Sequence, residues 1–199
     1  IYRDVWMICK NKIAITDAIE ANKVAGGGVF VHYNNISAKS ADIYVNTEVR
    51  NAGNKAKKIQ VEATITDKTG TTVKKISTVL ALKAGESKTA QLKTILANPM
   101  LWSPEHPYLY NINILVKDGK TALDGGMVRA GIRKTEFRGK DGFYLNDKPY
   151  GQLIGGNRHQ DFAYVGNAVP NSQQWRDVKR LRDAGCVIVR TAHYPQDPA

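Results

Sequence analysis

The chain has 199 residues, a charged fraction of 24% and a hydrophobic fraction of 42%, values typical of a folded protein that exclude disorder as its main state. No apolar run approaches the ~20 residues of a membrane-crossing helix, and residues 1–6 show no signal-peptide pattern. The length holds one large domain, or one domain and part of another. Because the chain opens without methionine and stops at Ala199, we expect it to be cut from a longer protein.

The formal net charge of +11 raises the question of nucleic-acid binding, because clustered Lys and Arg displace counterions from phosphates. This charge is divided between residues 1–132 and residues 133–199 in proportion to their lengths, with no basic block and no aromatic RNA-binding motif. We expect Lys57 and Lys58 at an exposed strand end, where lysines discourage pairing between sheet edges. The sequence therefore predicts no nucleic-acid partner and no membrane partner.

Up to residue 132 the pattern is a succession of strands. Apolar and polar residues alternate at period two, as in strands with one face in a core and one in water, at residues 29–31, 41–49, 59–65 and 110–116. Turn-forming residues separate the strands at 51–54, 67–70, 84–86 and 117–120. About seven short strands without a helical period predict an immunoglobulin-like antiparallel β-sandwich for residues 1–132, although a related jelly roll has the same pattern.

The pattern changes in the last third of the chain. Residues 136–147 predict a connecting hairpin, and residues 152–156 predict a short apolar strand that ends in glycines. A helix is expected between Ser172 as its N-cap and Gly185 as its stop. Its apolar residues recur at helical spacing: Trp175, Val178, Leu181 and Ala184. Residues 186–190 predict a strand buried on both faces, which completes one βαβ unit.

Two histidines follow the predicted strands of this unit, His159 after the first and His193 after the second. In α/β barrels this end of the strands carries the binding and catalytic groups. A complete (β/α)8 barrel takes about 250 residues, so residues 133–199 are expected to form only a truncated part of one. The histidines lack the i, i+4 spacing of a metal site, and the glycines at 26–28 precede a strand rather than a helix. The sequence therefore predicts no metal and no cofactor.

Four motifs occur in a recognisable order: Ile1-Tyr2-Arg3-Asp4-Val5-Trp6, Leu101-Trp102-Ser103-Pro104 with Pro107-Tyr108-Leu109-Tyr110, Gly155-Gly156-Asn157-Arg158-His159-Gln160-Asp161, and Arg190-Thr191-Ala192-His193-Tyr194-Pro195. Together they resemble glycoside hydrolase family 2, the β-galactosidase and β-glucuronidase group. The resemblance implies that residues 1–132 are the sandwich domain of that family and residues 133–199 the start of its catalytic TIM barrel. Gly156 stands where the family usually has Val, and Val187 where it usually has Asn, which indicates a divergent subgroup.

The resemblance also implies the chemistry: a retaining, β-galactosidase-like hydrolase that cleaves terminal β-linked sugars through two glutamates about 5–5.5 Å apart. Glu136 is the only glutamate after residue 132 and lies in the predicted hairpin, so we expect both catalytic glutamates beyond Ala199 and no activity from this chain alone. The family pattern assigns four residues to the site: His159, His193 and Asn157 to binding of the sugar, and Arg190 to orienting a carboxylate. Asn157 and Asp161 are also expected to hold the loop in place.

The expected partners are an oligo- or polysaccharide substrate and further domains of the same polypeptide, in a periplasmic or secreted protein by family habit. The alternative from another class is a non-catalytic carbohydrate-binding or interaction β-sandwich, with residues 133–199 as a separate appendage. An Asn-Glu pair at a later strand end, beyond Ala199, would favour the enzyme. Trp102 could serve as a sugar-stacking platform, but its flanking prolines favour a buried anchor of the sandwich.

Overall fold

The computed structural model describes residues 4–197, which form two compact units. The sandwich unit is Cys9–Lys134, and the other unit comprises residues 135–197 with residues 4–8. Residues 4–12 contain neither helix nor strand, so the succession of strands predicted for residues 1–132 begins at Ile13, and the start of the first motif lies outside the described residues. Within the described part of the chain, no helix is long and apolar enough to cross a membrane.

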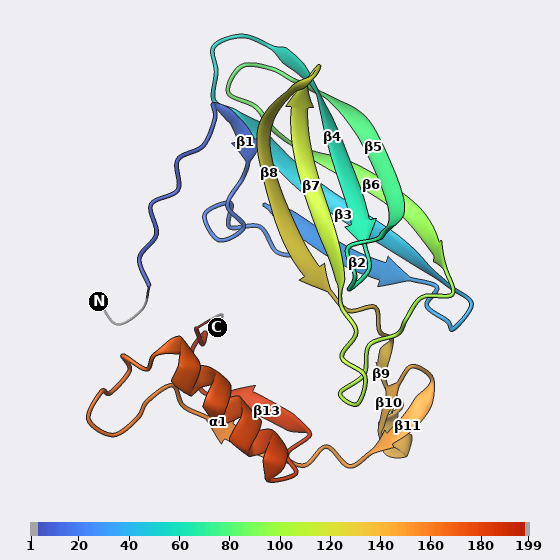
Figure 1. Ribbon diagram of the computed structural model, residues 1–199, viewed down its shortest axis with the longest axis vertical. Coiled ribbons are helices and arrows are strands. Elements are labelled where there is room, and N and C mark those ends of the chain that lie inside the picture. The colour runs from blue at the N-terminus through green and yellow to red at the C-terminus, as the bar shows by residue number, and fades with distance from the viewer. Residues whose placement is uncertain (1–3, 198–199) are drawn as a thin grey trace. The chain divides into compact units, whose positions relative to one another are not determined.

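Two four-stranded antiparallel sheets pack face to face in the sandwich unit (Figure 1). In one sheet the central strand β3 pairs with β6 on one side and with β1 and β2 on the other, and the second sheet has the order β5-β4-β7-β8. The strands are β1 (Ile13–Ile15), β2 (Val29–Asn34), β3 (Ser40–Asn51), β4 (Lys57–Thr66), β5 (Thr72–Leu82), β6 (Ser87–Ala97), β7 (Tyr110–Asp118) and β8 (Thr121–Ala130). This confirms the predicted immunoglobulin-like sandwich.

The core of the sandwich comes from alternate residues of its strands. On β4, Ile59, Val61 and Ile65 are buried, and on β7 the same holds for Ile112 and Ile114. Each strand therefore removes one apolar face from water, at roughly 25 cal/mol per Å² of apolar surface, which is the reason that period two predicts these strands.

Trp102, for which the flanking prolines predict a buried anchor, is half-buried in the structure. Its backbone N–H donates to the carbonyl oxygen of Ile132 at 2.8 Å. A Cβ placed on Gly131 would lie 2.8 Å from the indole ring, so the ring needs a glycine there. The guanidinium of Arg133 lies over the ring at 4.9 Å from its centroid. These contacts with neighbouring residues favour an anchor over an open stacking platform.

The other unit begins with a small antiparallel sheet in the order β11-β10-β9. Its strands are β9 (Thr135–Phe137), β10 (Phe143–Leu145) and β11 (Lys148–Gly151), with the 3-10 turn η1 (Gly139–Asp141) between the first two. The turns fall where the sequence predicts them: Gly142, Asn146 and Asp147 all have positive φ. The predicted connecting hairpin is therefore correct, with a third strand added.

The rest of this unit is one βαβ element, which we call the βαβ segment (residues 152–197). It consists of β12 (Gly155–Arg158), α1 (Asn171–Asp183) and β13 (Ile188–Thr191), and its two strands are parallel. The element type is as predicted, but the first strand begins where the sequence predicts its end. A Cβ on Gly155 would lie 1.7 Å from the carbonyl oxygen of Ile188, so the glycine permits the close strand pairing rather than ending the strand.

Two further details of the βαβ segment correct the sequence predictions. Pro170, not Ser172, is the N-cap of α1, and its carbonyl accepts the N–H groups of Gln173 and Gln174. The second strand is not buried on both faces: Ile188 is 46% exposed. With α1 and a single neighbouring strand, nothing in this segment covers the second face of the pair.

Candidate functional site

The two histidines predicted to line a pocket lie side by side. β12 ends at Arg158 and β13 at Thr191, so His159 and His193 come from the carboxyl ends of adjacent parallel strands. Their ring centroids are 5.5 Å apart, with the rings nearly perpendicular at 84°. The N–H of Ala192 donates to the carbonyl oxygen of Arg158 at 3.0 Å, which continues the strand pairing into the loops. The Ala192–His193 peptide bond is cis.

Asn157 and Arg190 are cross-strand partners on this pair of strands. Partners in a parallel pair point to the same face, and alternate residues point to opposite faces. Arg158 on β12 contacts α1, so Asn157 and Arg190 lie on the face turned away from the helix. Both side chains are exposed. This face therefore presents one amide and one guanidinium next to the end that carries the two histidines.

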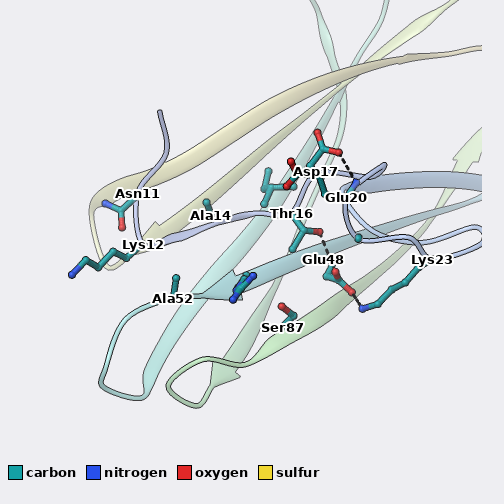
Figure 2. Close-up of a pocket in the computed structure, with 13 residues that line it drawn as sticks. Asn11, Lys12, Ala14, Thr16, Asp17, Glu20, Lys23, Glu48, Ala52 and Ser87 are labelled. Carbon is teal, nitrogen blue, oxygen red and sulfur yellow. Dashed lines mark hydrogen bonds and ion pairs between the residues drawn. The ribbon is translucent and has the colours of Figure 1, made fainter. Parts of the chain in front are cut away.

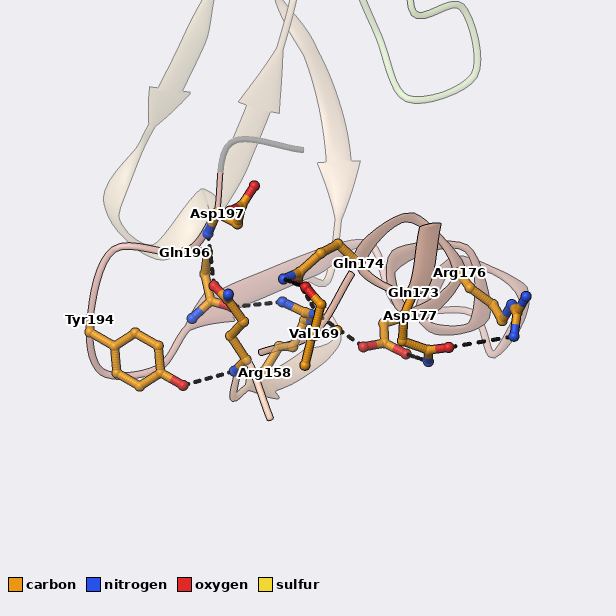
Figure 3. Close-up of polar contacts among 10 residues, drawn as sticks. Arg158, Val169, Gln173, Gln174, Arg176, Asp177, Tyr194, Gln196 and Asp197 are labelled. Carbon is orange, nitrogen blue, oxygen red and sulfur yellow. Dashed lines mark hydrogen bonds and ion pairs between the residues drawn. The ribbon is translucent and has the colours of Figure 1, made fainter. Parts of the chain in front are cut away.

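Arg158 holds the segment together on the other face, towards α1. One guanidinium nitrogen donates to Gln196 Oε1 at 2.6 Å, and the other donates to Gln174 Oε1 at 2.6 Å and Asp177 Oδ2 at 2.9 Å (Figure 3). Its side chain is only 10% exposed, so these charge-assisted bonds form in a largely dry environment. One arginine thus connects the first strand, the helix and the loop after the second strand.

The loops after the two strands are also joined directly to each other. The N–H of Gln160 donates to the Tyr194 hydroxyl at 2.9 Å, and the Gln160 side-chain oxygen accepts the N–H of Asp197 at 2.8 Å. Asn157 and Asp161, which the sequence predicts to hold the loop, are both exposed, and the hydrogen bonds that join the two loops involve Gln160, Tyr194 and Asp197. Position along the chain could have indicated the roles of Arg158 and Gln160. These two residues alternate with the exposed Asn157 and His159, so they point to the opposite face.

Gly156, a departure from the family pattern, has no steric reason in the described residues. A Cβ at this position would meet nothing within 4 Å. Glu136, the only glutamate after residue 132, lies on β9 and its carboxylate accepts a bond from Arg138 at 2.6 Å. It therefore occupies the small antiparallel sheet rather than the end of β12 or β13. No group of three potential ligands in the described residues could hold a metal ion.

The sandwich unit has a separate polar cavity of about 380 Å³ beside β1 and β3 (Figure 2). Glu48 lies at its base with a side chain only 4% exposed. The carboxylate accepts the Thr16 hydroxyl at 3.1 Å and pairs with the Lys23 ammonium. Each carboxylate oxygen thus has a partner from the 16–28 loop, which indicates that Glu48 holds that loop in place.

Two family models match the chain in succession. The model of glycosyl hydrolases family 2 matches residues 25–133, and the model of the TIM barrel domain of the same family matches residues 137–199. Among solved structures, a β-glucuronidase from Bacteroides uniformis superimposes with a TM-score of 0.89 at 31% identity, over 100% of this chain and 23% of that chain. The two matched parts thus follow one another along the chain, and the fold agrees with that of the solved structure.

Curated relatives carry two enzyme names. The chain is 33% identical over 197 residues to a β-galactosidase of Thermoanaerobacter pseudethanolicus, and 33% identical over 199 residues to a β-glucuronidase of Bacteroides fragilis. Each alignment covers 98% of this chain but only 24% and 27% of the respective relative, so the chain spans about a quarter of their length. With both its sandwich and its βαβ segment matched, this chain belongs to glycosyl hydrolases family 2.

Proposed function

We propose that this chain supplies part of the sugar site of a retaining, β-galactosidase-like hydrolase that cleaves terminal β-linked sugars. Residues 1–132 would be its immunoglobulin-like domain and residues 133–199 the start of its barrel. The observation that carries the proposal is the meeting of His159 and His193, 5.5 Å apart, at the carboxyl ends of two adjacent parallel strands. That is the end of a barrel at which catalytic and binding groups gather.

Each proposed role follows from the chemistry of the side chain. The imidazole nitrogens of His159 and His193 can exchange hydrogen bonds with sugar hydroxyls, and the Asn157 amide offers both a donor and an acceptor. Arg190 lies on the same face as Asn157 and carries the planar fork that holds a carboxylate in fixed geometry. In a retaining mechanism one carboxylate forms the glycosyl-enzyme and the other donates and accepts the proton. Glu136 is the only glutamate among residues 133–199. We therefore expect both catalytic carboxylates to come from a part of the longer protein outside this chain.

The test uses nitrophenyl β-galactoside with two proteins: the 199-residue chain and a longer protein that contains it. We expect no turnover by the chain alone. In the longer protein, His193→Ala and Arg190→Ala should each lower kcat/KM by about 100-fold, since each would remove a positioned polar contact to the reacting groups. His106→Ala is the matched control, because His106 is an exposed histidine in a loop of the sandwich unit.

Three outcomes would contradict parts of the proposal. Turnover by the purified chain would show that it carries its own catalytic carboxylates. A product with inverted anomeric configuration, measured by NMR, would exclude the retaining mechanism. A higher kcat/KM for nitrophenyl β-glucuronide than for the galactoside would replace the proposed substrate with the one named for the B. fragilis relative.

A further inference from the structure

Cations that are scattered along the sequence gather at one end of the sandwich unit. Because the strands are antiparallel, the β3–β4, β5–β6 and β7–β8 connections and the segment before β1 all lie at this end (Figure 1). We call it the basic end and define it by eight side chains: Lys12, Arg50, Lys55, Lys57, Lys58, Lys83, Lys88 and Lys120. Within residues 50–58, 82–88 and 118–120, only Glu86 and Asp118 are acidic.

The backbone beneath these cations is held by one buried residue. The Asn51 side-chain amide, 1% exposed as a residue, donates to the carbonyl oxygens of Lys55 at 2.9 Å and Lys83 at 3.0 Å. The Asn51 N–H donates to the carbonyl oxygen of Glu86, and the adjacent Ala52 N–H donates to that of Lys12 at 2.7 Å. Three chain segments that carry lysines are thus tied together, so the charges are held near each other before any partner binds.

Both carboxylates of the basic end are already engaged. Glu86 accepts the backbone N–H of Lys83 at 2.7 Å, and Asp118 pairs with Lys57 at 2.7 Å. Among the described residues, none of the other seven cations has an acidic group within ion-pair distance. All of the cations in this set are exposed. Their mutual repulsion is therefore not relieved within the described chain, and an added polyanion would relieve it.

The surface between these cations is hollowed. A groove of about 500 Å³ is lined by Lys57, Lys58, Lys83 and Lys88, and also by Glu86, Leu82, Ala56 and Ala81. Lys12 and Arg50 line the polar cavity beside β1 and β3, which is also lined by the acidic residues Asp17, Glu20 and Glu48. The groove thus carries four ammonium groups and one carboxylate, an excess of positive charge that favours anionic groups of an extended chain.

The residue types at this end select the class of polyanion. Residues 9–12, 50–58, 82–88 and 118–120 of this end contain no aromatic residue, whereas proteins that bind single-stranded nucleic acid stack bases on aromatic rings. They also expose no large apolar side chain that would insert into a membrane. Seven of the eight cations are lysines, which attract an anion as point charges rather than by a fixed fork. We propose that the basic end binds an anionic polysaccharide through its carboxylate or sulfate groups; the choice of a polysaccharide rests on the proposed function.

The test measures binding of the 199-residue chain to polygalacturonate, dextran sulfate, neutral dextran and duplex DNA. We expect binding to one or both anionic polysaccharides, weakening steeply with salt, and none to neutral dextran. The double variant Lys83→Glu/Lys88→Glu should weaken this binding by about tenfold or more. The control Lys39→Glu/Lys68→Glu changes the net charge equally at the 34–40 and 66–72 turns, and should weaken it by less than about twofold. Unfolding curves of both double variants would check that they fold.

Several results would overturn this inference. One is no binding to either anionic polysaccharide, and another is equal loss in the two double variants, which would show that only net charge matters. A third is duplex DNA competing at a lower concentration of charged groups than either polysaccharide, which would make this a nucleic-acid surface. Hydrolysis of nitrophenyl glycosides by the longer protein is measured separately. Failure to bind anionic polysaccharides would therefore leave the glycosidase proposal standing, and absence of hydrolysis would not alter the binding result.

Discussion

The sandwich unit and the βαβ segment are stabilised by different interactions. The sandwich has a core of twenty buried apolar residues between two sheets. In the βαβ segment only Val169 and Ala192 are buried apolar residues, while Trp175 is 67% exposed and Val178 53% exposed. Its elements are joined by the pairing of β12 with β13, by the bonds of Gln160 and by the hydrogen-bond network of Arg158. Hydrophobic burial thus accounts for the first region, and charge-assisted bonds in a partly dry setting account for the second.

The largest expected effect tests the apolar core. Ile112 is 1% exposed on β7, opposite Ile65 of β4. Ile112→Ala should lower the free energy of unfolding of the sandwich by about 3 kcal/mol, from lost burial and the cavity that remains. Denaturant unfolding followed by a sandwich probe measures this. A loss below about 1 kcal/mol would show that the core can close around the cavity. The sandwich core would then contribute less to stability than its contrast with the βαβ segment implies.

The next effect tests the polar network. Arg158→Met should leave Gln174, Asp177 and Gln196 without their shared donor, at a local cost of about 2 kcal/mol. Amide hydrogen exchange in residues 188–197 should then become about 30-fold faster, while exchange in β4 and β7 stays unchanged. Arg176→Met is the control, because Arg176 is an exposed arginine of α1 with a single 3.4 Å bond to Gln173. Equal acceleration in both variants would contradict the role of Arg158.

A smaller effect concerns the pH dependence of the sandwich. Glu62 accepts bonds from Lys117 and Lys75, each at 3.0 Å. These bonds hold the pKa of its carboxyl below the usual value, and the bond from Lys117 has the larger effect. A lowered pKa adds stability that is present above the pKa of the unfolded chain, about 4.3, and is lost as the pH falls through the folded value. Glu62→Gln should therefore lower the free energy of unfolding at neutral pH, by less than Ile112→Ala does. The difference between wild type and Glu62→Gln should shrink in acid.

The control for that measurement is Glu20→Gln, since Glu20 is exposed and has no ion pair with a described residue. Its stability should follow the wild-type curve at every pH. A difference between wild type and Glu62→Gln that persists unchanged in acid would show that the ion pairs are not its cause.

The smallest effect is expected on the exposed face of α1. Val178→Ser should change the free energy of unfolding by no more than about 0.5 kcal/mol, because the side chain is already 53% exposed. Thermal unfolding followed by helix content measures this change. A loss above about 1 kcal/mol would mean that this helix face is covered, and the contrast between the two regions would then disappear.

Much of the fold could be predicted from alternation alone. The segments at 41–49 and 59–65 became the central strands β3 and β4, because burying one face of a strand needs only local periodicity. The first strand of the βαβ segment was predicted too early, because its position depends on a contact between Gly155 and Ile188 that is remote in sequence. The N-cap was also misplaced at Ser172, since the first N–H groups of the helix donate to the backbone carbonyl of Pro170, a bond that needs no capping side chain.

The sequence by itself determined the strand periodicity, the two-part organisation and the motifs with His159 and His193, since these depend on residue type and spacing along the chain. Only the tertiary structure decided which side chains meet. It brought the two histidines to 5.5 Å, gave Arg158 its three partners and drew lysines from separate turns to one end of the sandwich. The net charge of +11 looked evenly spread because a count along the chain ignores antiparallel pairing, which returns successive turns to the same end.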